Sequence, residues 1–223
     1  TVNYKYNESY ISLTLLNTLI DDIILTDAVT DTTVLPNIKG KTKDIETGLI
    51  LSYGMKYSEK LNFGAGFKMA RKSVADSSAY GLGLDLSATY FYNDKLTLAV
   101  NLQNIMGTYL FWNNGTSEIL WPQVKIGAAY KVDEYNLLLT TDLDVRFEGR
   151  EEADAFAFSE ISIDPHVGLE YGLTKNIFLR AGYDVDRITY GAGLEYKKFR
   201  LNYGYVDHQD LDATQRISFS YLF

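Results

Sequence analysis

The stretch Thr214-Gln-Arg-Ile-Ser-Phe-Ser-Tyr-Leu-Phe223 decides the fold, because apolar and polar side chains alternate along it as far as the last residue. Successive side chains of a strand point to opposite faces. One face therefore carries only apolar groups: Ile217, Phe219, Tyr221 and Phe223. A soluble domain seldom ends on such a strand, since chain termini usually fray into polar tails. The stretch predicts an amphipathic final strand.

The composition allows one large all-β domain. The 223 residues are 46% apolar and include 18 Tyr, 17 Gly and 3 Pro, and tyrosine is favoured in strands. The mean hydropathy of -0.13 would be too polar for a helical membrane protein. In a membrane barrel, one face of each strand is polar, so this value fits. No stretch approaches the roughly 18 apolar residues that a membrane-spanning helix needs.

Several function classes are excluded by the same inventory. The net charge of -8 argues against nucleic acid, and the absence of cysteine excludes thiolate metal sites and disulfides. His166 and His208 are the only histidines, and no Gly-x-Ser-x-Gly motif accompanies them. Gly81 and Gly83 are spaced as on one strand face, with no helix after them to form a dinucleotide loop. We expect no catalytic residue, metal or cofactor.

From Ile45 onward the chain reads as about eleven segments of period two, and a further strand from Tyr10 to Leu16 makes about twelve. Each segment has roughly the nine to eleven residues that cross a bilayer at a tilt. The sequence therefore predicts a transmembrane antiparallel up-and-down β-barrel. The apolar sets of the eleven segments fall within 49–57, 61–69, 82–90, 96–102, 124–130, 137–145, 167–171, 177–183, 188–196, 199–205 and 214–223.

The connections between these segments alternate between two classes. The tight class holds Ser58-Glu59-Lys60, Asn93-Asp94, Asp133-Glu134, Thr174-Lys175 and Lys197-Lys198. The other class holds every long loop, 21–44, 72–79, 104–121, 148–161 and 207–213, and one short turn, Val185-Asp186. Outer-membrane barrels have short periplasmic turns and long extracellular loops. We therefore expect a bacterial outer-membrane location, with extracellular long loops and both termini periplasmic.

Several segments resemble the PorV/PorQ family of outer-membrane proteins, which is distantly FadL-like and whose PorV and PorQ members work in type IX secretion. The resemblance covers roughly Thr47 to Phe223. It is carried by Tyr80-Gly-Leu-Gly-Leu-Asp-Leu-Ser-Ala-Thr-Tyr90, Leu96-Thr-Leu-Ala-Val-Asn-Leu-Gln-Asn-Ile105, His166-Val-Gly-Leu-Glu-Tyr171, Phe178-Leu-Arg-Ala-Gly-Tyr183, Thr189-Tyr-Gly-Ala-Gly-Leu-Glu-Tyr196, Leu201-Asn-Tyr-Gly-Tyr-Val206 and the ending.

The resemblance implies a barrel of fourteen strands, two more than are visible. Either this single barrel domain, 1–223, lacks its N-terminal segment, or the chain is a smaller member. The ending with Phe219, Tyr221 and Phe223 resembles the closing strand of outer-membrane barrels, where a terminal aromatic is part of the signal read by the barrel-assembly machinery.

The resemblance also implies a non-enzymatic function, binding or passing on secreted proteins at the cell surface. Expected partners are outer-membrane lipid, the barrel-assembly machinery, and secreted cargo or other secretion components. Two alternatives are a FadL-like channel for hydrophobic small molecules and a structural barrel that anchors a surface layer. A channel predicts a lateral opening or an apolar pocket near the mouth, and a lumen packed by charges would count against it.

By strand parity, a set of charges of both signs faces the lumen, where mixed signs indicate paired groups that fill the interior rather than a pore selective for one charge. Asp142, Asp144 and Arg146 form a ladder along one wall; the two carboxylates could serve acid–base chemistry, but their spacing is commonplace in strands. The set is Lys68, Asp85, Lys125, Asp142, Asp144, Arg146, Glu170, Arg180, Glu195, Arg200 and Arg216.

The segment 104–122 is unusually apolar for a solvent loop. It is predicted either to fold over the barrel mouth as a lid or to form a docking surface for a secreted partner, since exposed apolar patches rimmed by polar residues mark interaction sites. Its candidate residues are Met106, Tyr109, Leu110, Phe111, Trp112 and Trp121.

Overall fold

A computed structural model describes residues 1–26, 37–147, 156–158, 160–185, 187–207 and 213–222, and for 156–158 the backbone only. Apart from turns and the short 3-10 helix η1 (Asp133–Tyr135), these residues form antiparallel strands, as predicted. None of the helices among these residues has the length and apolar character needed to cross a membrane. The described residues form two compact units, each considered by itself.

The first unit contains β1 (Val2–Tyr6), β2 (Ser9–Thr26), β3 (Ile38–Lys56), most of β4 (Leu61–Val74) and the first part of β5 (Ser77–Phe91), paired in this order. It also holds β7 (Thr108–Trp112) and β8 (Ser117–Leu120). The strand β1 was not predicted. It pairs with the start of β2, from Val2 opposite Leu13 to Tyr6 opposite Ser9.

The second unit contains the rest of β4 and β5, nearly all of β6 (Leu96–Gln103), and β9 (Gln123–Val132), β10 (Leu137–Arg146) and β12 (Ile161–Gly172). It continues with β13 (Ile177–Asp184), β14 (Arg187–Tyr196), β15 (Phe199–Val206) and β16 (Thr214–Tyr221), again paired in this order, with β11 (Phe156–Phe158) beside β12. The predicted tight turns are confirmed, because β3–β4, β5–β6, β9–β10, β12–β13 and β14–β15 are each joined by two to four residues.

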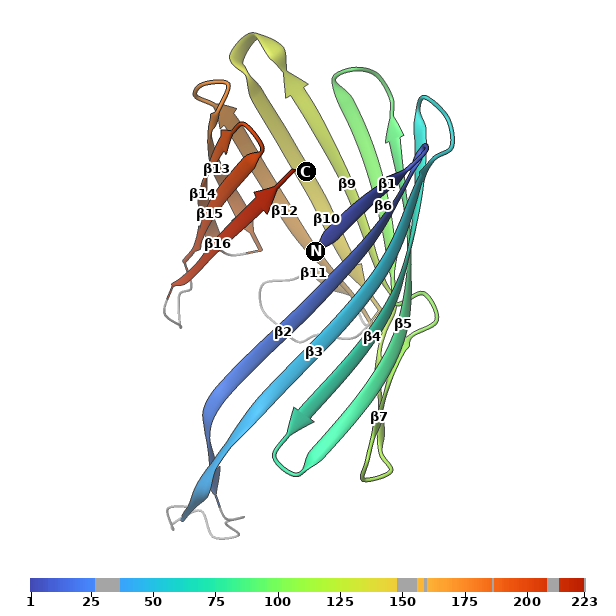
Figure 1. Ribbon diagram of the computed structural model, residues 1–223, viewed down its shortest axis with the longest axis vertical. Helices are drawn as coiled ribbons and strands as arrows, with labels where there is room; N and C mark the ends of the chain where they lie inside the picture. The colour runs from blue at the N-terminus through green and yellow to red at the C-terminus, as the bar shows by residue number, and fades with distance from the viewer. Residues whose placement is uncertain (27–36, 148–155, 159, 186, 208–212, 223) are drawn as a thin grey trace. The chain divides into compact units, whose positions relative to one another are not determined.

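The β2–β3 hairpin is much longer than expected, and the predicted loop 21–44 is wrong for most of its length. The two strands pair from Ser9 opposite Met55 to Thr26 opposite Ile38, with a bulge near Asp22 (Figure 1). Charged residues in the extension form cross-strand ion pairs, Lys41 with Asp22 at 2.8 Å and Lys43 with Asp21 at 3.0 Å. A stretch that reads as a polar loop is therefore a strand.

Two more of the predicted long loops are replaced by regular structure. Residues 72–79 form the ends of β4 and β5, joined by a turn at Ala75 and Asp76, in which Ala75 has a φ of 51°. The segment 104–121 contains the hairpin β7–β8, and β7 pairs with β5 from Ala79 opposite Trp112 to Leu82 opposite Tyr109. The predicted loops 148–161 and 207–213, with His208, and the turn at Asp186 lie largely outside the described residues.

The final strand β16 pairs with β15 along its whole length, as its alternation predicts. The ring of Phe199 lies 5.7 Å from that of Phe219 and 5.1 Å from that of Tyr221. Phe223, the third residue of the predicted assembly signal, lies outside the described residues.

The pattern of exposure is the reverse of that in a soluble domain, because large apolar side chains are exposed and small or polar ones are buried. Along β5 the even positions from Tyr80 to Leu86 are exposed, whereas the odd positions Ala79, Gly81 and Gly83 are buried. In the described part of the chain, only Ala79 and Leu110 are buried apolar side chains, and large apolar residues are exposed on every strand of the sheet's main path. An apolar surface of this extent requires an apolar surrounding, as in a transmembrane β-sheet.

Candidate functional site

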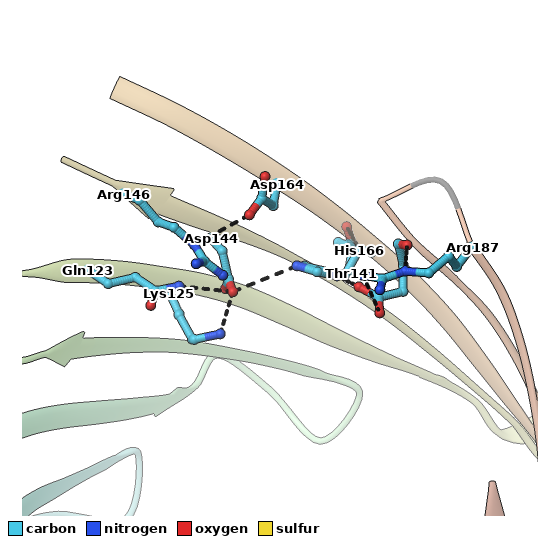
Figure 2. Close-up of polar contacts among 9 residues, drawn as sticks. Gln123, Lys125, Thr141, Asp144, Arg146, Asp164, His166 and Arg187 are labelled. Atoms are coloured by element: carbon cyan, nitrogen blue, oxygen red, sulfur yellow. Dashed lines mark hydrogen bonds and ion pairs between the residues drawn. The ribbon is translucent and has the colours of Figure 1, made fainter. Parts of the chain in front are cut away.

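The second unit carries a cluster of ionised groups on the less exposed face of β9, β10, β12 and β13. At its centre the Asp144 side chain is only 4% exposed. Its Oδ2 accepts hydrogen bonds from Lys125 Nζ and, at 3.0 Å, from Gln123 Nε2 (Figure 2). The cluster forms because β9 places Lys125 opposite Asp144 of β10.

His166 of β12 lies between two carboxylates in this cluster. Its Nδ1 is 2.7 Å from Asp184 Oδ1, and its Nε2 is 3.8 Å from Asp144 Oδ2 (Figure 2). The backbone at His166 is also held, since Thr141 Oγ1 donates to the His166 carbonyl at 3.1 Å. Arg187 is 3.4 Å from Asp184. We call Gln123, Lys125, Asp142, Asp144, His166 and Asp184 the Asp144 cluster.

The other predicted lumen charges of this unit mostly form cross-strand pairs. Arg180 is 2.6 Å from Glu170 and donates to Asn202 Oδ1 at 2.9 Å. Arg200 pairs with Glu195 at 2.5 Å, and Arg146 with Asp164 at 3.4 Å. Asp142 and Arg216 have no hydrogen-bond or ion-pair partner among the described residues.

Sequence reasoning missed Asp164, Asp184, Arg187 and the position of His166. The parity of β12 places His166 on the same face as Glu170, and this signal could have found it. Its neighbours belong to other strands, and only the register, with Asp142 opposite His166 and His166 opposite Asp184, brings them together.

The charges do not fill this face, because a hollow of about 690 Å³ lies over it. Its floor includes the neighbouring glycines Gly168 and Gly182 and the pair Gly191 and Gly204. A Cβ atom at Gly204 would meet no atom within 4 Å. Charged and polar groups line the hollow: Asp142, His166, Glu170, Arg180, Asp184, Asn202 and Arg216.

The first unit has a second polar cluster where the chain leaves β6 and begins β7. Asp85 Oδ1 is 2.7 Å from Lys68 Nζ and accepts the Asn104 N–H at 2.9 Å. Asn104 Oδ1 in turn accepts from Lys68 Nζ at 2.7 Å and from Thr108 Oγ1 at 2.8 Å. Asn104 itself has a φ of 51°. We call Lys68, Asp85, Asn104 and Thr108 the break cluster, because their hydrogen bonds fix the chain where strand geometry is interrupted between β6 and β7.

Glycines in β5 make room for this arrangement. A Cβ atom at Gly83 would lie 2.1 Å from Thr108 Oγ1 and 3.2 Å from Lys68 Cε. At Gly81 it would lie 2.7 Å from Leu110 Cδ2. The two glycines thus allow β7 to place Thr108 and Leu110 over β5, a role that their spacing on one strand face does not reveal.

An apolar pocket of about 370 Å³ adjoins the break cluster. Asp85 belongs to both, and Ile105, inside the break, lines the pocket while its N–H donates to the Leu84 carbonyl at 3.0 Å. The pocket is lined by Ile11, Leu51, Ser52, Tyr53, Ala65, Gly66, Phe67, Leu84, Asp85, Leu86 and Ile105.

The predicted lid or docking residues are divided between the two faces of the β7–β8 hairpin. Tyr109 and Phe111 are exposed, stack at 6.2 Å and extend the exposed face formed by Tyr80 and Leu82. Leu110 is buried and Trp112 half-buried. Met106 and Trp121, outside the two strands, are exposed.

Comparison with known proteins identifies the fold. The structure of the Pseudomonas putida toluene transporter TodX matches with a TM-score of 0.64, covering 92% of this chain and 73% of TodX at 13% sequence identity. A Pseudomonas aeruginosa FadL homologue matches with a TM-score of 0.58, covering 96% of this chain and 68% of the homologue at 11% identity. No protein-family model and no curated protein matches the chain. The chain therefore has the antiparallel up-and-down fold of outer-membrane β-barrels, as predicted.

Proposed function

We propose that the protein is a non-enzymatic outer-membrane channel for small hydrophobic molecules, and that the apolar pocket beside the break cluster is the point where they pass through the sheet. The observation that carries this proposal is the pocket of about 370 Å³ with almost entirely apolar walls. Binding pockets for small molecules have volumes of about 300–1,000 Å³, and apolar walls select an apolar ligand.

The position of the pocket supports passage of a ligand through the sheet rather than binding of a ligand on one face only. Its lining combines Leu51 and Leu86, from the exposed face of the sheet, with Gly66 and Asp85 from the other face. Between β6 and β7 the chain departs from strand geometry over four residues, 104–107. In that interval the Leu84 carbonyl of β5 accepts a hydrogen bond from the Ile105 N–H, and the Asp85 side chain accepts one from the Asn104 N–H.

Two further considerations agree with this function. TodX is described as a toluene transporter and a monoaromatic hydrocarbon channel, and its fold is similar. The hollow over the glycine floor of the second unit leaves space beside the paired charges. The protein in this proposal sits in the bacterial outer membrane, in contact with lipid, with its tight turns and both termini periplasmic and its long loops extracellular. In the cell, the barrel-assembly machinery would insert it into the membrane.

Filling the pocket tests the proposal. Ala65→Phe places a ring among the pocket walls, and we expect uptake of radiolabelled toluene to fall about tenfold, as for a barrier raised by about 1.4 kcal/mol. Uptake is measured in outer-membrane-bearing cells that lack other hydrocarbon channels, with folded protein quantified by heat-modifiable migration in gels.

The matched control is Ala128→Phe, a similar change on the strand β9 of the second unit, at a residue that does not line the pocket. It should leave uptake unchanged. Equal uptake by wild type, Ala65→Phe and cells without the protein would reject the channel function.

A PorV/PorQ-like role in binding secreted proteins is the second candidate. The observation that favours it is the exposure of Met106 and Trp121, 72% and 52%, at the base of the β7–β8 hairpin. The double variant Met106→Ser, Trp121→Ser keeps both strands of the hairpin. If secreted proteins dock there, this variant should copurify at least about tenfold less cargo from native membranes, a loss of about 1.4 kcal/mol. Unchanged copurification would reject this docking surface. No observation favours the surface-layer anchor.

A further inference from the structure

We propose that Asp142, Asp144 and His166 bind one divalent first-row transition-metal ion, for which Zn²⁺ is the probe. Asp142 and Asp144 are neighbours on one face of β10, and His166 of β12 lies opposite Asp142. One potential ligand atom from each of the three side chains lies within 4.8 Å of the others. From the sequence alone, no metal site is expected. This inference does not depend on the channel function.

The imidazole of His166 is held in the orientation that a metal ligand needs. An ionised carboxylate can only accept, so the 2.7 Å contact with Asp184 Oδ1 requires the proton on His166 Nδ1. In the neutral ring the other nitrogen, Nε2, presents a lone pair toward Asp144 at 3.8 Å, which is too long for a hydrogen bond. A carboxylate that fixes the distal nitrogen is the usual support of a metal-bound histidine.

The two carboxylates have coordinating capacity that the protein does not use. Asp144 is buried, and its Oδ1 has no hydrogen-bond partner among the described residues although water cannot reach it. Asp142 has no polar partner in the described part of the chain. A buried carboxylate oxygen without a partner is costly, and a coordinated cation removes that cost.

The charge balance around the site also favours a cation. Four carboxylates, Asp142, Asp144, Asp164 and Asp184, face three permanent cations, Lys125, Arg146 and Arg187. With a neutral His166, these groups carry one negative charge in excess, and Asp142 is the carboxylate for which the described residues supply no ion-pair partner. Arg216, which also lines the hollow, forms no ion pair with this group in the described part of the chain. Lys125 contacts Asp144 through Oδ2, the oxygen that also lies nearest His166, whereas Oδ1 has no partner among the described residues.

The ligand set selects the class of metal. Ca²⁺ takes about six to eight oxygen ligands, whereas one imidazole with two carboxylates suits Zn²⁺ and similar ions. Ligands about 2.0–2.2 Å from a tetrahedral Zn²⁺ lie roughly 3.4 Å from one another, so the three groups need only small side-chain rotations. Asp142 and His166 also line the hollow, so an open coordination position would face it.

Metal binding is tested on the full chain, refolded in detergent without a polyhistidine tag and stripped with chelator. Calorimetric titration with ZnCl₂ should show one equivalent bound by the wild type. His166→Gln should weaken binding by at least about a hundredfold. The chain has two histidines, so His208→Gln is the matched control and should bind as the wild type does. Absence of stoichiometric binding by the wild type, or loss of binding in His208→Gln alone, would overturn the proposal.

A measurement on the wild type keeps the proposal testable if His166→Gln fails to fold. X-ray absorption of the Zn²⁺-loaded protein should show one imidazole, with oxygen ligands at about 2.0–2.2 Å. A shell of oxygen alone would overturn the assignment and would fit an imidazolium that bridges Asp144 and Asp184. Asp184→Asn, which removes the charge that supports the ring and pairs with Arg187, should weaken Zn²⁺ binding by about ten- to a hundredfold with the same ligands in the spectrum.

Discussion

Replacing Lys125 with methionine should destabilise the folded protein by about 2–3 kcal/mol, because the buried Asp144 carboxylate loses its cation. The Lys125 side chain is itself 36% exposed, so the loss is smaller than for a pair buried on both sides. The Asp144 carboxylate is 4% exposed, and Lys125 Nζ is the cation in contact with its Oδ2. Methionine keeps the length of the side chain but removes the charge. The free energy of unfolding is measured by urea titration in detergent micelles, in metal-free buffer so that no ion replaces the lysine.

A second substitution separates the missing charge from lost packing. In the double variant Lys125→Met, Asp144→Leu the buried charge is gone, and stability should return to within about 1 kcal/mol of the wild type, since apolar residues often replace buried ion pairs without loss. A double variant as unstable as the single one would show that the methionine acts through packing.

The Glu195–Arg200 pair is the matched control on another part of the sheet. Its side chains are 37% and 52% exposed, so solvent screens their interaction. Arg200→Met should therefore cost less than about 1 kcal/mol. Equal losses in Lys125→Met and Arg200→Met would mean that burial of Asp144 has no energetic consequence.

Strands whose side chains alternate along their own length could be predicted from the sequence. The segments 82–90 and 188–196 each show apolar residues on one face, and both are strands with the expected faces. The extensions of β2 and β3 could not be predicted in this way, because neither alternates apolar with polar side chains. The end of β2 reads Asp21-Asp22-Ile23-Ile24-Leu25-Thr26, and the lysines at the start of β3 are separated by Gly40 and Thr42. These extensions are joined by cross-strand ion pairs such as Lys41 with Asp22, and a sequence pattern along one strand does not show such pairs.

The candidate sites depend on the register between neighbouring strands, and the sequence of a single strand does not determine that register. The parity of β10 places Asp142 and Asp144 on one face, but the register with β12 decides that His166 joins them. Similarly, Gly83 reads as one more small residue in a strand. Gly83 is needed because Thr108, 25 positions later in the sequence, lies over it and leaves no room for a Cβ atom.

Adding a single methyl group at Gly83 should disrupt the attachment of β7 to β5. In Gly83→Ala the new Cβ lies 2.1 Å from Thr108 Oγ1, and Thr108 is buried and bonded to Asn104, so it has no free space to move into. Overpacking of this kind costs about 1–3 kcal/mol. The urea midpoint should fall, and a cleavage site inserted at Asn114, in the β7–β8 turn, should become more accessible to protease.

Two companion variants show whether the clash is the cause. Thr108→Ala removes Oγ1, and the nearest remaining atoms, Lys68 Cε at 3.2 Å and Thr108 Cβ at 3.3 Å, are tight but tolerable contacts. The double variant Gly83→Ala, Thr108→Ala should therefore be less destabilised than the sum of the two single variants. Gly204→Ala makes the same change on β15, where the new Cβ meets no atom within 4 Å. Because alanine restricts the unfolded chain, that variant should be neutral or more stable by up to about 1 kcal/mol. If Gly83→Ala is as harmless as Gly204→Ala, β7 does not lie against β5 as described, and the pocket beside the break cluster has no fixed wall.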